Sequence, residues 1–161
     1  MLQDYPNTQL FINGEWQNSK SNETLEIINP ATEEVIGKLS HARKEDLDVA
    51  LNAAENAFNE WKNVSAYERS KILRKAADIF RSRADYIAKL MTIEQGKPLV
   101  EAKIETLGAA DSIEWYAEEG RRAYGRIIPA RASGVYQFVF KEPVGVVAAF
   151  TPWNFPLNQV V

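Results

Sequence analysis

Residues 144–156 read VGVVAAFTPWNFP, a run of seven side chains without a polar group followed by a segment that contains two prolines. A short apolar run between prolines is typical of a strand buried on both faces of a parallel sheet. A parallel neighbour requires a crossover of about a dozen residues or more, and eleven residues follow Phe150. The sequence therefore predicts an α/β chain whose central strand begins an incomplete sheet.

The TPWNFP segment is restrained at two points, because a residue that precedes proline is confined to extended backbone. Thr151 and Phe155 both precede proline, so Trp153 and Asn154 lie between two stiff positions. Open α/β sheets bind ligands at the carboxyl ends of their strands, and a fixed asparagine amide can donate to a developing oxyanion. From these residues alone, a structural turn and an oxyanion site both remain open.

Upstream of this stretch, two β-hairpins are expected to form an edge layer. Asn13-Gly14 between apolar flanks favours a type I′ turn, because both central residues of that turn need a positive φ. Residues 29–32, NPAT, predict a second turn between strands at residues 25–28 and 35–36.

Apolar side chains at helical spacing predict three long helices in the middle of the chain. The first begins near residue 44, and the face that it is expected to bury consists of Leu47, Leu51, Ala54, Phe58 and Trp61. The second begins at a capping box formed by Ser65 and Glu68 and ends at residues 96–98. The third runs from about residue 99 to Gly120 or Gly125.

Composition excludes several classes of function. The 161 residues suffice for about one domain, and 22 acidic against 19 basic side chains give a net charge of −3, so we expect no nucleic-acid or membrane partner. The absence of cysteine excludes disulfides and a thiol nucleophile from this chain. No signal peptide and no run of ~20 apolar residues is present, so we expect a cytoplasmic protein.

Two groups of polar residues are interpreted as structural. His41 is the one histidine, and without a second ligand we expect a solvated loop residue, not a metal ligand. A solvated, salt-bridged helix face is expected for Glu114, Glu118, Glu119, Arg121 and Arg122. Because no two glycines are two residues apart, the Gly-x-Gly-x-x-Gly phosphate cradle is missing.

Six motifs, in this order and at this spacing, resemble the NAD(P)-dependent aldehyde dehydrogenase superfamily. They are FINGEW at 11–16, NPAT at 29–32, EQGKP at 94–98, YG at 124–125, PVGVV at 143–147 and PWNFP at 152–156. The resemblance covers nearly the whole chain. LMTIEQGKPLVEAK and IEWYAEEGRRAYG are most similar to the succinate-semialdehyde dehydrogenase branch.

The resemblance implies the N-terminal part of the aldehyde dehydrogenase fold. Residues 1–125 would be the β-hairpins and helices of the cofactor-binding domain, residues 126–142 would be an oligomerisation hairpin segment, and residues 143–161 would start the dinucleotide-binding sheet. The full-length parent is expected to form a homodimer or homotetramer.

The resemblance also implies a chemistry, namely oxidation of an aldehyde, such as succinate semialdehyde, to a carboxylic acid with NAD or NADP as acceptor. Asn154 would be the catalytic residue that helps to form the oxyanion hole. Thr151, Pro152, Trp153 and Asn154 would line the nicotinamide-cofactor cleft. Because the thiol nucleophile of the family is absent, the chain alone is expected to be inactive.

Two other hypotheses of function remain. One is a non-catalytic interaction module that docks on a full-length homologue, favoured by the missing thiol and by an apolar strand edge that is prone to pair with another chain. The other is a free-standing helical binding domain, which the apolar strand at residues 144–150 disfavours.

Overall fold

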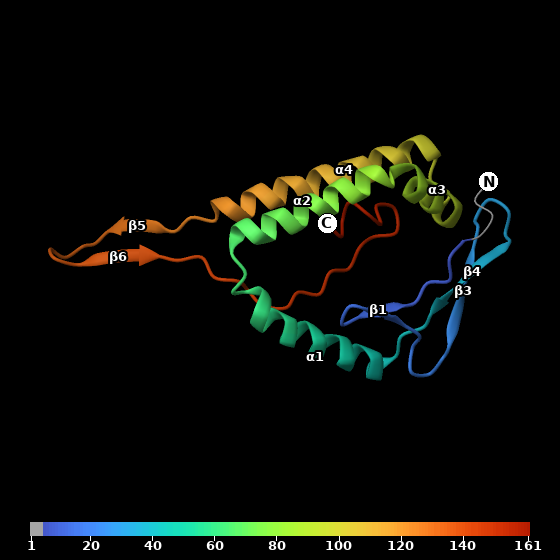
Figure 1. Cartoon of the computed structure of the whole chain (residues 1–161), viewed down its shortest axis with the longest axis horizontal. Helices are drawn as coiled ribbons and strands as arrows, with labels where there is room; N and C mark the ends of the chain where they lie inside the picture. Colours follow the sequence, from blue (N-terminus) through green and yellow to red (C-terminus); the bar gives the residue numbers. More distant parts are fainter. Residues whose placement is uncertain (1–4) are drawn as a thin grey trace.

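The computed structural model describes residues 5–161, which contain four α-helices and three two-stranded antiparallel sheets (Figure 1). The elements are β1 (Leu10–Ile12), β2 (Glu15–Gln17), β3 (Thr24–Ile28), β4 (Val35–Ser40), α1 (Lys44–Trp61), α2 (Ala66–Ser82), α3 (Ala84–Gln95), α4 (Leu99–Glu119), a 3-10 turn (Gly120–Arg122), β5 (Arg126–Pro129) and β6 (Tyr136–Val139).

Both N-terminal hairpins are confirmed. Asn13 and Gly14 have φ values of 54° and 82°, as the predicted type I′ turn requires, and they join β1 to β2. β3 pairs with β4, but the two hairpins form separate sheets instead of one layer. Residue 8, just before β1, lies beside β4, where the Thr8 amide donates to the Lys38 carbonyl at 2.8 Å and the Ser40 amide donates to the Thr8 carbonyl at 2.8 Å.

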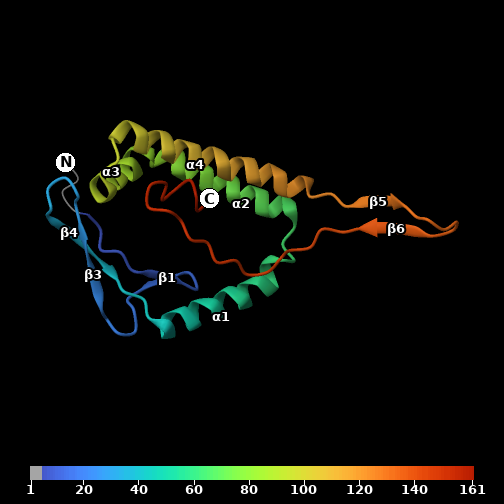
Figure 2. The same ribbon diagram turned by 180° about the vertical axis from the view of Figure 1, so that it is seen from behind.

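Helices α2 and α4 lie side by side and form the main core (Figures 1 and 2). Ala77 of α2 and Ala110 of α4 are fully buried where the helices meet, together with Ile113. Small side chains at these positions let the two helix backbones approach closely. Outside this core, Glu118 pairs with Arg121 at 3.2 Å and Glu119 pairs with Arg122, which confirms the expected salt-bridged face.

The second predicted helix is corrected to two helices. α2 ends at Ser82 and α3 begins at Ala84, because Arg83 has φ −106° and ψ 10°, outside the helical region. The break sets α3 against the start of α4, where Ala88 and Met91 bury against Ala102. The apolar spacing of the sequence continues across Arg83 and carries no sign of this break.

Helix α1 does not bury the apolar face that its spacing predicts. Leu47 is 54% exposed and Leu51 is 48% exposed. The buried residue of α1 is Asp46, whose carboxylate accepts hydrogen bonds of 2.9 Å from the backbone amides of Lys20 and Arg43. The start of α1 is therefore held by a polar contact with Lys20, which precedes β3. Most of the apolar side chains of α1 remain exposed to solvent.

The C-terminal part begins with the expected hairpin, in which β5 pairs with β6 and projects beyond the helices (Figure 1). The chain then returns along α2 and α4 towards α3 (Figure 2). Residues 144–150, predicted to start a dinucleotide-binding sheet, pair with no strand in residues 5–161, and Val144 and Phe150 are 93% and 94% exposed. The expected strand is absent here because a strand forms by pairing with a neighbour, and the described part of the chain offers none.

Candidate functional site

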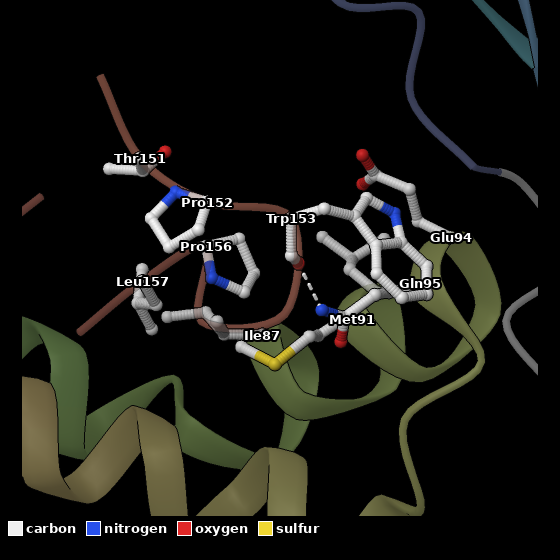
Figure 3. Close-up of a pocket in the computed structure, with 10 residues that line it drawn as sticks. Ile87, Met91, Glu94, Gln95, Thr151, Pro152, Trp153, Pro156 and Leu157 are labelled. Carbon is white, nitrogen blue, oxygen red and sulfur yellow. Dashed lines mark hydrogen bonds between the residues drawn. The ribbon is translucent and has the colours of Figure 1, made fainter. Parts of the chain in front are cut away.

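The TPWNFP segment forms a turn that lies against α3 (Figure 3). The cavity between them has a volume of about 250 Å³. Its lining from the turn includes Thr151, Pro152 and Trp153, and its lining from α3 includes Met91 and Glu94. The structure therefore brings together three of the four residues that were predicted to line a cofactor cleft.

Asn154 is not among the residues that line this first cavity. It lines a second cavity of about 420 Å³ together with Phe155 and residues from the start of α4. The Asn154 residue is exposed, and within residues 5–161 its side-chain amide makes no hydrogen bond. Both N–H donors of this amide are thus available to a bound molecule.

Polar contacts from the last residue of α3 and from the segment between α3 and α4 hold the backbone of the turn. The Gln95 side-chain amide donates to the carbonyl oxygen of Trp153 (Figure 3). The Lys97 ammonium donates to the carbonyl oxygen of Asn154 at 2.7 Å and lies 4.4 Å from the centroid of the Phe155 ring. Lys97 therefore contacts Asn154 and its neighbour while leaving the Asn154 amide free.

Glu105 holds the other end of the turn from within α4. Its side chain is 2% exposed, and it forms an ion pair with Lys97, whose side chain is 12% exposed. Its Oε1 atom accepts hydrogen bonds from the backbone amides of Leu157 at 3.0 Å and Asn158 at 3.2 Å. Burial raises the pKa of Glu105, but the hydrogen bonds from Lys97 and the two amides outweigh it and hold the pKa below the ordinary value.

Sequence reasoning missed Gln95, Lys97 and Glu105 as parts of the site. A signal for Glu105 was present, because it lies among positions with the helical spacing of a buried face, such as Ala102 and Ala109. A carboxylate on a buried face requires partners. The sequence did not reveal that these partners are Lys97 and the amides after Pro156.

His41, which was interpreted as a loop residue, is partly buried. His41 lies in the loop before α1, with Nδ1 3.8 Å from a carboxylate oxygen of Glu23. Among residues 5–161 no group of three His, Cys, Asp or Glu side chains is placed to bind a metal ion. In the same range, no helix is long and apolar enough to cross a membrane.

Comparison with known proteins decides the family. A sequence model of the aldehyde dehydrogenase family matches residues 16–161. The chain belongs to the aldehyde dehydrogenase family. It spans about a third of the length of the relatives that it matches, and solved structures of relatives contain NADP or NAD⁺.

Three relatives of this aldehyde dehydrogenase chain illustrate the similarity. The 4-(hydroxymethyl)benzenesulfonate dehydrogenase TsaD1 of Comamonas testosteroni is 48% identical over 92% of this chain and 31% of the relative. The succinate-semialdehyde dehydrogenase [NADP(+)] GabD of Escherichia coli is 43% identical over 94% of this chain and 32% of the relative. The crystal structure of a succinate-semialdehyde dehydrogenase from Burkholderia pseudomallei has a TM-score of 0.93 and 42% identity, and the match covers 96% of this chain and 32% of that chain.

Proposed function

We propose that this chain supplies the N-terminal part of an enzyme that oxidises an aldehyde to a carboxylic acid with NAD or NADP. The observation that carries the proposal is the free side-chain amide of Asn154, exposed in a cavity while its backbone is held by Lys97. A nucleophile that adds to an aldehyde places negative charge on the carbonyl oxygen. Asn154 can donate to that oxygen, and a pre-positioned donor of this kind lowers the barrier by about 3 kcal/mol.

Thr151, Pro152 and Trp153 are proposed to form one wall of the cofactor cleft. Their cavity of about 250 Å³ has room for one ring of a dinucleotide, and the Trp153 side chain offers an apolar face beside it. The nicotinamide cofactor supplies the hydride acceptor when it is bound. The role of this chain is to position that ring beside the turn that carries Asn154.

The proposed substrate is succinate semialdehyde or a similar aldehyde with an anionic group at its far end. The names of the relatives support this class, because 4-(hydroxymethyl)benzenesulfonate carries a sulfonate and succinate semialdehyde carries a carboxylate. The EQGKP motif belongs to the stretch that resembles the succinate-semialdehyde branch, and it lies beside the cavity of about 420 Å³ that Asn154 lines.

The role of Asn154 is tested in the complete enzyme that contains this chain. We expect Asn154→Ala to lower kcat by about 100-fold and to leave KM for the cofactor nearly unchanged, because the lost donor acts in the transition state. The matched control is Asn56→Ala, on the exposed side of α1. An unchanged kcat in Asn154→Ala would overturn the assignment.

The substrate class is tested by comparing succinate semialdehyde with butanal, which has the same chain length and no charge. A site with a partner for the distant carboxylate should give a kcat/KM at least about 100-fold higher for succinate semialdehyde. Equal values for the two aldehydes would contradict the anionic class while leaving aldehyde oxidation itself in place. The same assay with NAD and NADP identifies the preferred cofactor.

Residues 126–142 are proposed to act in assembly with a second copy of the chain. The β5–β6 hairpin projects from the helices, and its exposed apolar side chains include Ile127 and Tyr136, which are 76% and 80% exposed. An isolated two-stranded hairpin is marginally stable in water, which supports a partner. Sedimentation of the complete enzyme checks this, since Tyr136→Lys should shift it to a smaller species.

A second candidate is the non-catalytic module that docks on a full-length homologue. The unpaired apolar segment at residues 144–150 favours it, since such a segment can pair with a strand of another chain. Co-expression of this chain with a tagged full-length homologue tests the idea. Failure to co-purify would exclude stable docking.

A further inference from the structure

We propose that Glu105 and Lys97 are positioning residues that hold the turn carrying Asn154 in its working place. The inference deepens the proposed function and rests on it, since Asn154 is the oxyanion donor there. Neither residue needs to touch the substrate. Each acts through the backbone on one side of Asn154.

The two oxygens of the Glu105 carboxylate have different partners. Oε1 accepts from the backbone amides of Leu157 and Asn158, and Oε2 pairs with the Lys97 ammonium. Lys97 in turn donates to the carbonyl oxygen of Asn154. One buried carboxylate is thereby connected to the turn both at Asn154 and just after Pro156, so that its position determines the path of the chain between them.

The same contacts argue against two other roles for these side chains. Lys97 lines the cavity beside Asn154, but its charge is already compensated by Glu105, so it is poorly suited to bind a substrate carboxylate. Glu105 is a poor general base, because both of its oxygens are engaged and its pKa is held below the ordinary value. The side chains of Lys97 and Glu105 are 12% and 2% exposed, and both are hydrogen-bonded to main-chain groups. Such a buried pair is suited to hold the backbone of the turn in a fixed position.

The contacts of Glu105 are tested by amide hydrogen exchange, measured by NMR on the 161-residue chain. In Glu105→Ala the amides of Leu157 and Asn158 should exchange at least about tenfold faster, because they lose a charged acceptor. Glu105→Gln keeps an acceptor oxygen and removes the charge, so it should give a smaller increase in these exchange rates. This variant also keeps the test valid if the alanine variant fails to fold.

Glu119→Gln is the matched control, because it makes the same change in α4 at an exposed pair with Arg122. Its exchange rates at Leu157 and Asn158 should equal those of the unchanged chain. Rates within about twofold of the unchanged chain in both Glu105 variants would overturn the inference, since hydrogen bonds to a charged group protect more than that.

Kinetics of the complete enzyme separate positioning from general support of the fold. Glu105→Gln and Lys97→Met should each lower kcat by roughly tenfold with little change in KM for the cofactor, and the double variant should lose about as much as either single one. Additive losses would overturn the shared role. If the exchange rates rise while kcat stays unchanged in both Glu105→Gln and Asn154→Ala, the support of the turn stands and the proposed oxyanion role fails.

Discussion

Lys97 donates a hydrogen bond of 2.7 Å to the backbone carbonyl oxygen of Asn154, which lies 57 residues further along the chain. This contact joins the EQGKP motif to the PWNFP motif, two of the six by which the sequence resembles its family. The turn that carries the proposed oxyanion donor is therefore supported by the connection between α3 and α4. Its position depends on how these helices meet.

The ion pair of Lys97 should contribute more to stability than an exposed pair in the same region. Lys97→Met leaves the Glu105 carboxylate buried without its counter-ion, and we expect a loss of about 3 kcal/mol in the free energy of unfolding. The control is Lys103→Met, which removes an exposed pair with Asp85 and should cost far less, because water screens exposed ion pairs. Urea unfolding measures both, and equal losses would contradict the prediction.

The stability of the chain should fall in acid partly through Glu105. Burial raises its pKa, yet the bonds from Lys97 and the amides of Leu157 and Asn158 hold it below the ordinary value of 4.5. The unfolded state then binds the proton more readily, so the stabilisation is complete above pH 4.5 and is lost as the pH falls through the lower folded pKa.

Urea unfolding across a pH series checks this contribution. Between about pH 5 and pH 3 the free energy of unfolding should decrease more steeply in the unchanged chain than in Glu105→Gln, which has no proton to take up at this position. Glu119→Gln, at the exposed pair with Arg122, should keep the steeper slope. Identical slopes in all three proteins would show that Glu105 does not contribute to the loss of stability in acid.

The start of α2 should depend on its N-cap. Ser65 Oγ accepts a hydrogen bond of 3.2 Å from the Glu68 amide, which is one half of the predicted capping box, while the Glu68 carboxylate pairs with Lys71. Ser65→Ala should destabilise the chain by about 1 kcal/mol, because an amide of the first turn loses its partner. Ser133→Ala, in the exposed turn between β5 and β6, should be neutral. Thermal unfolding followed by circular dichroism compares the two variants. An unchanged melting temperature for Ser65→Ala would show that the N-cap does not stabilise α2.

Two glycines with open space around them should respond differently to alanine. A Cβ atom at Gly14 or at Gly120 meets no heavy atom within 4 Å. Gly14 has φ 82°, so Gly14→Ala should cost about 1 kcal/mol through backbone strain alone. Gly120 has φ −57°, which alanine adopts freely, so Gly120→Ala should be neutral or stabilising by up to about 1 kcal/mol. Equal melting temperatures would contradict the difference.

Local features of the fold could be predicted from the sequence because their causes lie within a few residues of one another. The positive φ values at Asn13-Gly14, the cap at Ser65 and the stop at Gly96 each follow from the chemistry of one short segment. The break at Arg83 could not be predicted, since the apolar spacing is the same on both sides of it. The exposure of the apolar face of α1 could not be predicted either, because it depends on whether another element packs against that face.

The sequence by itself determined the hairpins, the helical middle and the family, together with the restrained TPWNFP turn, because proline, glycine and apolar spacing act through the adjacent backbone. The tertiary structure alone decided that Thr151 and Asn154 line different cavities and that Glu105 and Lys97 hold the turn. These relationships join residues that are about 50 positions apart. Such partners are chosen by the way α3 and α4 pack, and no local spacing of residues encodes that choice.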